Sequence, residues 1–259
     1  MKKRILTIGL LMMSVFCYAQ DLSLYQKKFY TSDNDTLPYR LLLPENFNAN
    51  KKYPLIFFLH GAGERGTDNE KQLTHGAKLF LQDTVRKKYP AIVVFPQCPA
   101  NSFWSNVDID VDGKNRTFSF PEEGAPTVAM RLAQELLKKI LKEYHISKKQ
   151  VYVGGLSMGG MGTFEIARRN PDLFAAAFPI CGGGNPATAS KLKNISWWVF
   201  HGAKDDVVLP ENSEVMVNAL KAVKASVKYT LYPNANHNSW DPAFAEPELL
   251  PWLFSKKKK

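Results

Sequence analysis

Short apolar segments alternate with helical patterns along this chain, and no other feature limits its fold as strongly. Strand-length segments separated by amphipathic helices form β–α–β units, which assemble into a mostly parallel sheet. Helices then cover both faces of that sheet. Eight segments are expected to be its strands: residues 28–31, 39–43, 55–59, 92–95, 151–154, 175–180, 197–200 and 227–231.

The first two of these segments are polar-flanked and close together, so they are predicted to pair as an antiparallel hairpin at the edge of the sheet. Residues 99–126 show no regular pattern. They are expected to form one long loop, whose aromatic residues wall a binding cleft or cap the sheet. Four helices are predicted: over residues 127–144, from Ser157 to just before Pro171, over 211–225 and over 248–254.

Ser157 lies in the sequence Gly155-Leu-Ser-Met-Gly159, between a predicted strand and a predicted helix. This is the G-x-S-x-G motif in the strand–turn–helix context that gives the motif its meaning. Its two glycines keep Cβ atoms out of a sharp turn, and the turn projects the serine hydroxyl above the sheet. Glycines at these positions would also suit close packing of a helix on a sheet, so the assignment depends on residues further along the chain.

Asp205 and His237 each follow a predicted strand, where ligands bind in doubly wound sheets, so they should lie on the same rim as Ser157. A serine hydroxyl needs an imidazole to take its proton, and that imidazole needs a carboxylate to orient it. We therefore predict Ser157 as nucleophile, His237 as base and Asp205 as orienting acid. Asp206 is the alternative acid, but Asp205 stands four residues after His201 in an H-G-x-x-D pattern.

An oxyanion formed during acyl transfer needs two N–H donors. The first is predicted to be the backbone N–H of Met158, the residue after the nucleophile. The second is predicted to be that of Ala62, because the loop after the third strand has glycines on either side of it; Gly61 is the alternative.

Three further side chains are candidates for contacting a substrate. Arg65 belongs to the same glycine-rich loop, Trp104 to the long irregular stretch, and Trp240 follows His237 closely. His60 and His201 each precede a glycine at a strand end and are expected to hold loops by hydrogen bonds.

Five motifs are spaced along the chain: Leu59-His-Gly-Ala-Gly-Glu-Arg-Gly66, Pro96-Gln-Cys98, Gly155-Leu-Ser-Met-Gly-Gly160, Pro179-Ile-Cys-Gly-Gly-Gly184 and His237-Asn-Ser-Trp240. With these motifs the chain resembles the compact bacterial α/β-hydrolase esterases. Those proteins are often labelled predicted peptidases or phospholipase/carboxylesterase-like proteins and are related to the acetylxylan and feruloyl esterases. The resemblance implies an α/β-hydrolase fold with a mostly parallel eight-stranded sheet, and a Ser-Asp-His carboxylesterase without a cofactor. It matches onto Ser157, Asp205 and His237, with oxyanion N–H groups at Ala62 and Met158.

The expected substrate is a small-molecule ester or a polysaccharide-linked one, such as an acetyl or feruloyl ester of a plant polysaccharide. No large lid insertion is expected before the third helix, which argues against a true lipase. A serine peptidase or amidase acting on small peptides would use the same triad and is the first alternative. The second is an inactive carbohydrate-binding relative, although such relatives usually lose a triad residue.

The first 19 residues have the features of a secretory signal peptide: Lys2, Lys3 and Arg4, an apolar run over residues 5–16, and a small-x-small site ending at Ala19. Cleavage there would leave residues 20–259 as a single domain of a secreted or periplasmic protein. No later segment reaches the roughly 18 uninterrupted apolar residues of a membrane helix, so no membrane insertion is expected.

The net charge of +10 is concentrated at the ends of the chain. Three of these charges lie in the predicted signal peptide and four in the tail of residues 256–259, which leaves +3 for the body. No basic stripe with interleaved aromatic residues is visible, so a nucleic-acid partner is not expected.

No metal or cofactor is expected. Residues 108–113 resemble the opening of a calcium-binding loop, but Ser119 stands where that loop needs a bidentate glutamate. Cys98 and Cys181 are predicted at strand ends three positions apart, about 14 Å at the usual strand spacing, so a disulfide between them would need excursions of the loops that carry them.

Overall fold

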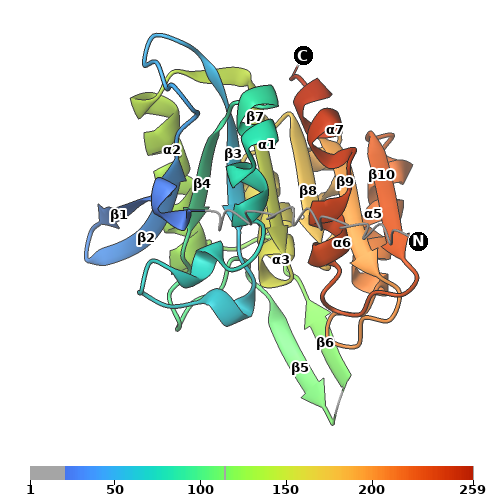
Figure 1. Ribbon diagram of the computed structural model, residues 1–259. Coiled ribbons are helices and arrows are strands. Elements are labelled where there is room, and N and C mark those ends of the chain that lie inside the picture. Colours follow the sequence, from blue (N-terminus) through green and yellow to red (C-terminus); the bar gives the residue numbers. More distant parts are fainter. Residues whose placement is uncertain (1–20, 114, 259) are drawn as a thin grey trace, which may run out of the picture.

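The computed structural model describes residues 21–113 and 115–258, so the predicted signal peptide lies outside the described residues. Eight strands form one sheet (Figure 1). All eight predicted strands are confirmed. In spatial order they are β1 (Gln26–Ser32), β2 (Asp35–Leu42), β4 (Ile92–Pro96), β3 (Tyr53–Leu59), β7 (Ile146–Leu156), β8 (Ala176–Ile180), β9 (Ser196–Gly202) and β10 (Val227–Tyr232).

The sheet is antiparallel only at one edge. β1 pairs with β2 in the predicted hairpin, and β2 pairs antiparallel with β4. From β4 to β10 every neighbouring pair is parallel. The carboxyl ends of these parallel strands therefore meet at one edge of the sheet, where a doubly wound fold places its ligands.

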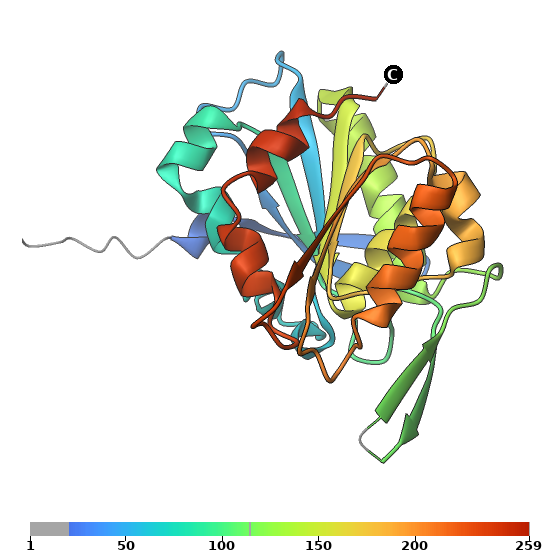
Figure 2. The ribbon, with the colours of Figure 1, turned by 90° about the vertical axis from the view of Figure 1, so that its right-hand side faces the viewer.

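Helices cover both faces of the sheet (Figure 2). One face packs against α2 (Val128–Glu143), α3 (Met158–Arg169), α4 (Ala189–Leu192) and α5 (Glu211–Ala222). The other packs against α1 (Asp83–Lys88), α6 (Trp240–Ala245) and α7 (Leu249–Ser255). The four predicted helices correspond to α2, α3, α5 and α7. The other three span six residues or fewer, too short to show a helical period in the sequence.

Residues on β3 show how the sheet separates two cores. Leu55, Phe57 and Leu59 point into the cluster beneath α2 and α3, whereas Ile56 and Phe58 point into the opposite cluster. All five side chains are fully buried. A strand buried on both faces is apolar throughout, which is why the sequence shows runs rather than alternation there.

The long segment of residues 99–126 is not the irregular loop that the sequence predicts. It contains a two-stranded antiparallel hairpin, β5 (Asp108–Asp112) and β6 (Asn115–Ser119), that projects beyond the body of the molecule (Figures 1 and 2). The resemblance to a calcium loop therefore reflects the alternation of a strand.

Two smaller observations complete the fold. Cys98 and Cys181 are both buried and both free. In the part of the chain that the structure describes, no helix is long and apolar enough to cross a membrane.

Candidate active site

Ser157 occupies a sharp turn between β7 and α3. Its backbone angles, φ 53° and ψ −119°, lie in a region that non-glycine residues rarely adopt. The flanking glycines make the turn possible: a Cβ on Gly155 would collide with the carbonyl of Gly159, and a Cβ on Gly159 would collide with the carbonyl of Leu59. The turn places the hydroxyl at the carboxyl edge of the sheet.

His237 lies between Ser157 and Asp205. Its Nε2 atom is 2.9 Å from Ser157 Oγ, and its Nδ1 atom is 2.8 Å from Asp205 Oδ2. Asp205 follows β9 and His237 follows β10, so three consecutive crossovers bring the three side chains to one rim. The structure thus brings together the residues predicted as nucleophile, base and acid, and Asp205 rather than Asp206 meets the imidazole.

Asp205 is ionised. Burial alone would raise the pKa of this carboxyl group, but hydrogen bonds from His201, His237 and the Val208 N–H hold the pKa well below its usual range. Its Oδ1 atom accepts from the backbone N–H groups of Val207 and Val208 at 2.9 and 3.0 Å. An ionised carboxylate only accepts hydrogen bonds, so His237 Nδ1 carries a proton. A neutral His237 therefore presents its unprotonated Nε2 to the serine hydroxyl.

A second histidine contacts the same carboxylate oxygen. The fully buried His201 places Nε2 at 3.1 Å from Asp205 Oδ2 and 2.7 Å from the carbonyl of Val208. Its Nδ1 lies 2.7 Å from Ser213 Oγ, which in turn donates to the carbonyl of Gly182. The predicted loop-holding role of His201 is correct, but the sequence reasoning missed its contact with Asp205. The four-residue spacing in H-G-x-x-D was the available signal.

The two predicted oxyanion donors lie beside Ser157. Met158 is the first residue of α3, so its N–H has no acceptor within the helix. Ala62 is the first residue of a short 3₁₀ helix over Ala62–Glu64, directly after the extended Gly61. Both residues line the same cavity as Ser157 and His237.

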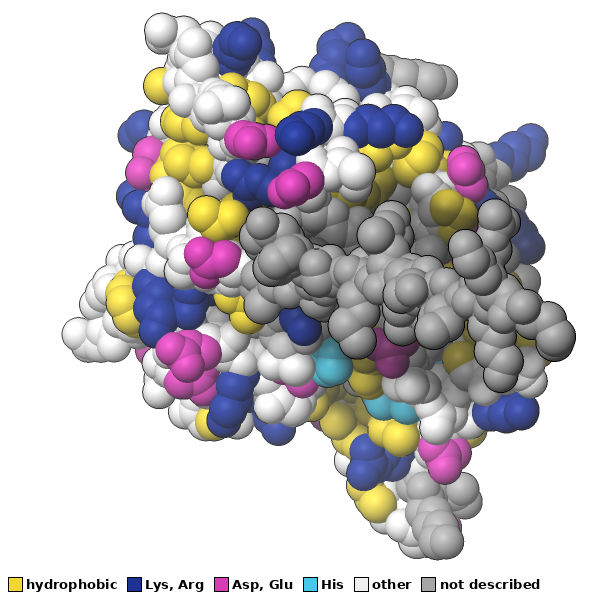
Figure 3. Space-filling model, in the orientation of Figure 1, with side chains coloured by type: hydrophobic (Ala, Val, Ile, Leu, Met, Phe, Trp, Pro, Cys, Tyr) yellow, Lys and Arg dark blue, Asp and Glu magenta, His cyan; other side chains and the backbone are white. Residues whose placement is uncertain are grey.

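That cavity has a volume of about 500 Å³. Apolar side chains and histidines gather where the hairpin leaves the body of the molecule (Figure 3). The walls of the cavity come from the loop after β3, the hairpin, the start of α3 and the loops after β9 and β10. Beyond the residues already placed, the side chains that line it include Glu64, Arg65, His75, Phe103, Ile109, Val111, Arg116, Phe118, Met161, Val207 and Trp240.

The candidates for substrate contact divide between the cavity and the core. Arg65 and Trp240 both line the cavity, and the Trp240 ring meets the His237 ring edge-on, with centroids 5.5 Å apart. Trp104 does not line it. Its side chain is fully buried and donates through Nε1 to the carbonyl of His60 at 3.1 Å, so the prediction for this residue is wrong. The rings that face the cavity from that segment are those of Phe103 and Phe118.

Cys181, Asp205 and His237 are the one group in the described residues whose ligand atoms cluster closely enough to hold a metal ion, all within 4.8 Å of one another. Burial raises the pKa of the Cys181 thiol, and the charge of Asp205 raises it further. A protonated thiol is a poor metal ligand, because the thiolate is the species that binds. The cluster is therefore better suited to the hydrogen-bonded pairing seen between Asp205 and His237.

The family assignment agrees with this geometry. The family model named Esterase, with the description "Putative esterase", matches residues 32–229. The chain belongs to this esterase family. Its fold is accordingly that of the α/β-hydrolases, as the sequence motifs imply.

The chain is similar to several known proteins, among them solved structures. A thermostable esterase is 36% identical and superposes with a TM-score of 0.81, covering 91% of this chain and 64% of that one. A bifunctional acetylxylan esterase/xylanase from Neocallimastix patriciarum is 28% identical over 167 residues, 64% of this chain and 21% of that protein. "Probable feruloyl esterase C" from Aspergillus oryzae is 24% identical over 184 residues, 71% of this chain and 60% of that protein. The chain spans less than two thirds of the length of each.

Proposed function

We propose that this esterase hydrolyses carboxylic esters through a covalent acyl-enzyme on Ser157. The observation that carries the proposal is the chain of contacts from Ser157 Oγ through His237 to Asp205, with distances of 2.9 and 2.8 Å. This is the arrangement in which an imidazole takes the serine proton while a carboxylate fixes its tautomer.

In the first half of the reaction, Ser157 Oγ attacks the ester carbonyl carbon as its proton passes to His237 Nε2. The carbonyl oxygen becomes an oxyanion, which the N–H groups of Ala62 and Met158 stabilise. The tetrahedral intermediate then collapses, the bond to the alcohol oxygen breaks, and His237 returns the proton to that oxygen. The alcohol leaves and the acyl group remains on Ser157.

In the second half, water takes the place of the alcohol. His237 Nε2 removes a proton from the water as the water oxygen attacks the acyl carbon. Collapse of the second intermediate breaks the bond to Ser157 Oγ, which recovers its proton from His237. Asp205 stays ionised throughout and stabilises the imidazolium form of His237.

For the substrate we propose small-molecule esters or acetyl or feruloyl esters of plant polysaccharides. The apolar and aromatic lining of the cavity supports an acyl group of appreciable size, and two relatives are named acetylxylan esterase and feruloyl esterase. We also propose that residues 1–19 are removed on secretion and that residues 20–259 form one domain.

The test is acid release by the purified protein from p-nitrophenyl acetate, methyl ferulate and acetylated xylan, compared with the Ser157→Ala variant. We expect kcat/KM to fall by at least about 10³-fold in the variant, because removal of the nucleophile leaves only binding and oxyanion stabilisation. Hydrolysis of aminoacyl amides in preference to esters would favour the peptidase alternative. No release from any substrate by the wild type would contradict the proposal.

A further inference from the structure

The β5–β6 hairpin has two chemically different faces. Cross-strand pairs Ile109 with Phe118 and Val111 with Arg116 share one face, and all four side chains line the cavity that contains Ser157. The aspartates at positions 108, 110 and 112 alternate with them on the other face and do not line the cavity. This face, apolar except for Arg116, is therefore aimed at the site, although Ile109 and Val111 remain 44% and 59% exposed. It is called the apolar face below.

The hairpin does not belong to the main sheet. Among the described residues, β5 and β6 pair with each other only and form a separate two-stranded sheet. An isolated pair of strands is marginally stable in water and has no fixed orientation of its own. Contacts at the base of the hairpin must therefore determine where its apolar face lies.

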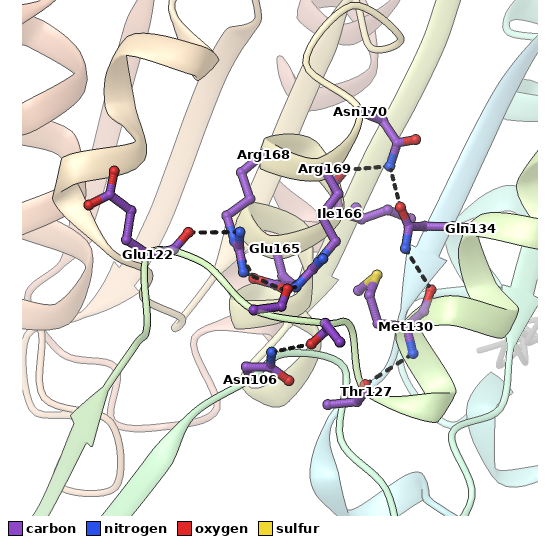
Figure 4. A network of polar contacts seen from close by, with 12 residues as sticks. Asn106, Glu122, Thr127, Met130, Gln134, Glu165, Ile166, Arg168, Arg169 and Asn170 are labelled. Atoms are coloured by element: carbon purple, nitrogen blue, oxygen red, sulfur yellow. Dashed lines mark hydrogen bonds and ion pairs between the residues drawn. The ribbon is translucent and has the colours of Figure 1, made fainter.

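The return strand of the hairpin leads into residues 120–126, and side chains from other elements bind its carbonyl groups. Arg168 Nη1 donates to the carbonyl of Glu122 at 3.0 Å, and Arg169 Nη2 donates to that of Gly124 at 2.9 Å (Figure 4). Asn106 donates to Ala125 O at 2.6 Å, which ties the two legs of the hairpin together.

Glu165 orients both arginines. Its side chain is only 6% exposed and accepts from Arg168 Nε and Arg169 Nε, each at 2.6 Å. Each guanidinium thus uses one side of its planar fork for the carboxylate and another N–H for a loop carbonyl (Figure 4). The arginine side chains are themselves 10% and 13% exposed, so their positions are well defined by packing.

These three residues lie on α3, the helix that begins immediately after Ser157. One rigid element of 12 residues therefore carries the proposed nucleophile at its first end and the base of the hairpin at its other end. The distance between the reacting oxygen and the apolar face of the hairpin is set through this helix.

We propose that Glu165, Arg168 and Arg169 are positioning residues that hold the hairpin over Ser157 and so determine affinity for esters with a bulky, apolar acyl group. The inference rests on the proposed function of the site. An aromatic acyl group reaches the hairpin face from Ser157, whereas an acetyl group is too small to do so. These three residues, the Glu165 cluster, therefore lower the KM for aromatic esters and have little effect on the turnover of acetyl esters.

Single substitutions test this inference without leaving Glu165 unpaired. In Arg168→Met, Arg169 still pairs with Glu165, but the bond to the carbonyl of Glu122 is lost. Arg168→Lys keeps the positive charge without the fork that binds both partners at once. Arg131→Met is the matched control, because Arg131 also pairs with carboxylates, Asp35 and Glu135, but makes no contact with the hairpin legs.

For Arg168→Met and Arg168→Lys we expect KM for methyl ferulate to rise about fivefold or more, with kcat and all constants for p-nitrophenyl acetate within about twofold. Arg131→Met should leave both substrates unchanged. An equal loss on both esters, or unchanged KM for methyl ferulate, would overturn the inference. If the wild type hydrolysed neither ester, the proposed function would be contradicted. The variants would then be compared by the Kd of ferulate, measured by calorimetry.

A second measurement needs no activity. Glu122 and Glu123 lie in the anchored leg, so a glutamate-specific protease reports release of that leg. We expect cleavage after these residues to be about tenfold faster in Arg168→Met than in the wild type or Arg131→Met. Equal cleavage rates in all three proteins would show that the arginines do not hold the hairpin.

Discussion

Asp205 is the residue on which the charge distribution of the site depends. One of its oxygens serves two histidines, and the other accepts two backbone N–H groups. These bonds fix the carboxylate and keep it ionised, so it holds His237 in the tautomer that can accept the serine proton. Asp206, its neighbour in sequence, does not occupy this position.

This difference gives a prediction with a control one residue away. Asp205→Asn should lower kcat by about 10³- to 10⁴-fold, because an amide can bind His237 in the wrong tautomer. Asp206→Asn should keep kcat within about twofold. Steady-state kinetics on p-nitrophenyl acetate would measure both. A larger loss for Asp206→Asn than for Asp205→Asn would assign the acid to the other residue.

His60 gives a prediction about stability and pH. Burial lowers the pKa of His60 to about 4 from the model-compound value of 6.5. Its Nε2 accepts from the N–H of Cys98, so the neutral ring is the form that the fold requires. Between these two pH values the unfolded chain binds more protons than the folded chain, so stability must fall as the pH is lowered from 6.5 towards 4.

The size of this effect can be isolated with a variant. The wild type should lose roughly 2–3 kcal/mol through His60 between pH 7 and pH 4.5. His60→Gln, which keeps a hydrogen-bonding side chain but cannot be protonated, should lack that part of the pH dependence. Urea unfolding at the two pH values measures the difference. The same dependence in both proteins would show that His60 is not buried in its neutral form.

At this scale the sequence predicted residues that chemistry constrains and missed those that packing constrains. The contacts among Ser157, His237 and Asp205 agree with the prediction, because the proposed reaction constrains the order of these residues and their places after strands. Trp104 was wrongly predicted to contact the substrate, because the sequence does not show whether an aromatic ring in an irregular segment faces a cavity or the core. The four-residue spacing of His201 and Asp205 was the one signal for their contact, but spacing alone does not give the path of the loop between them.

At the level of elements, α2 shows how a single side chain can define a boundary. Thr127 caps this helix by accepting from the N–H of Met130 at 3.1 Å, and its hydroxyl donates to the carbonyl of Phe103 at 2.6 Å. Thr127→Ala should therefore lower the free energy of unfolding by about 1–2 kcal/mol. Thr127→Ser retains the hydroxyl and should cost much less. Denaturant unfolding of the two variants compares them, and equal losses would argue against the cap.

The strands of the hairpin were not predicted from the sequence, although β5 alternates polar and apolar residues. That alternation spans only the five residues of β5, and β6 has a single apolar residue, Phe118, among polar ones. Strands of the main sheet were easier to recognise, because burial on both faces makes them continuously apolar. Buried strands can therefore be recognised from their apolar composition, whereas the strands of an exposed hairpin can be recognised only from a short alternation of apolar and polar residues.

Across the whole molecule, the sheet and its two cores form the rigid part, and the site is assembled from loops at one edge. All eight strands contribute buried or partly buried apolar side chains to the two clusters. None of the hairpin residues that the structure describes belongs to either cluster. Stability and substrate contact are therefore separated in space, and this separation leads to a test.

Replacement of residues 108–119 by two glycines should leave the thermal stability of the fold nearly unchanged. Asp108 and Ser119 are paired neighbours across the hairpin, so a short link can join the chain on either side of them. Because the hairpin buries little apolar area against the body, we expect the Tm to shift by no more than about 3 °C. Phe57→Ala, which removes a fully buried ring from β3, should by contrast cost about 3–5 kcal/mol. A comparable loss on deleting the hairpin would mean that it forms part of the folding unit and is not an appendage positioned by the Glu165 cluster.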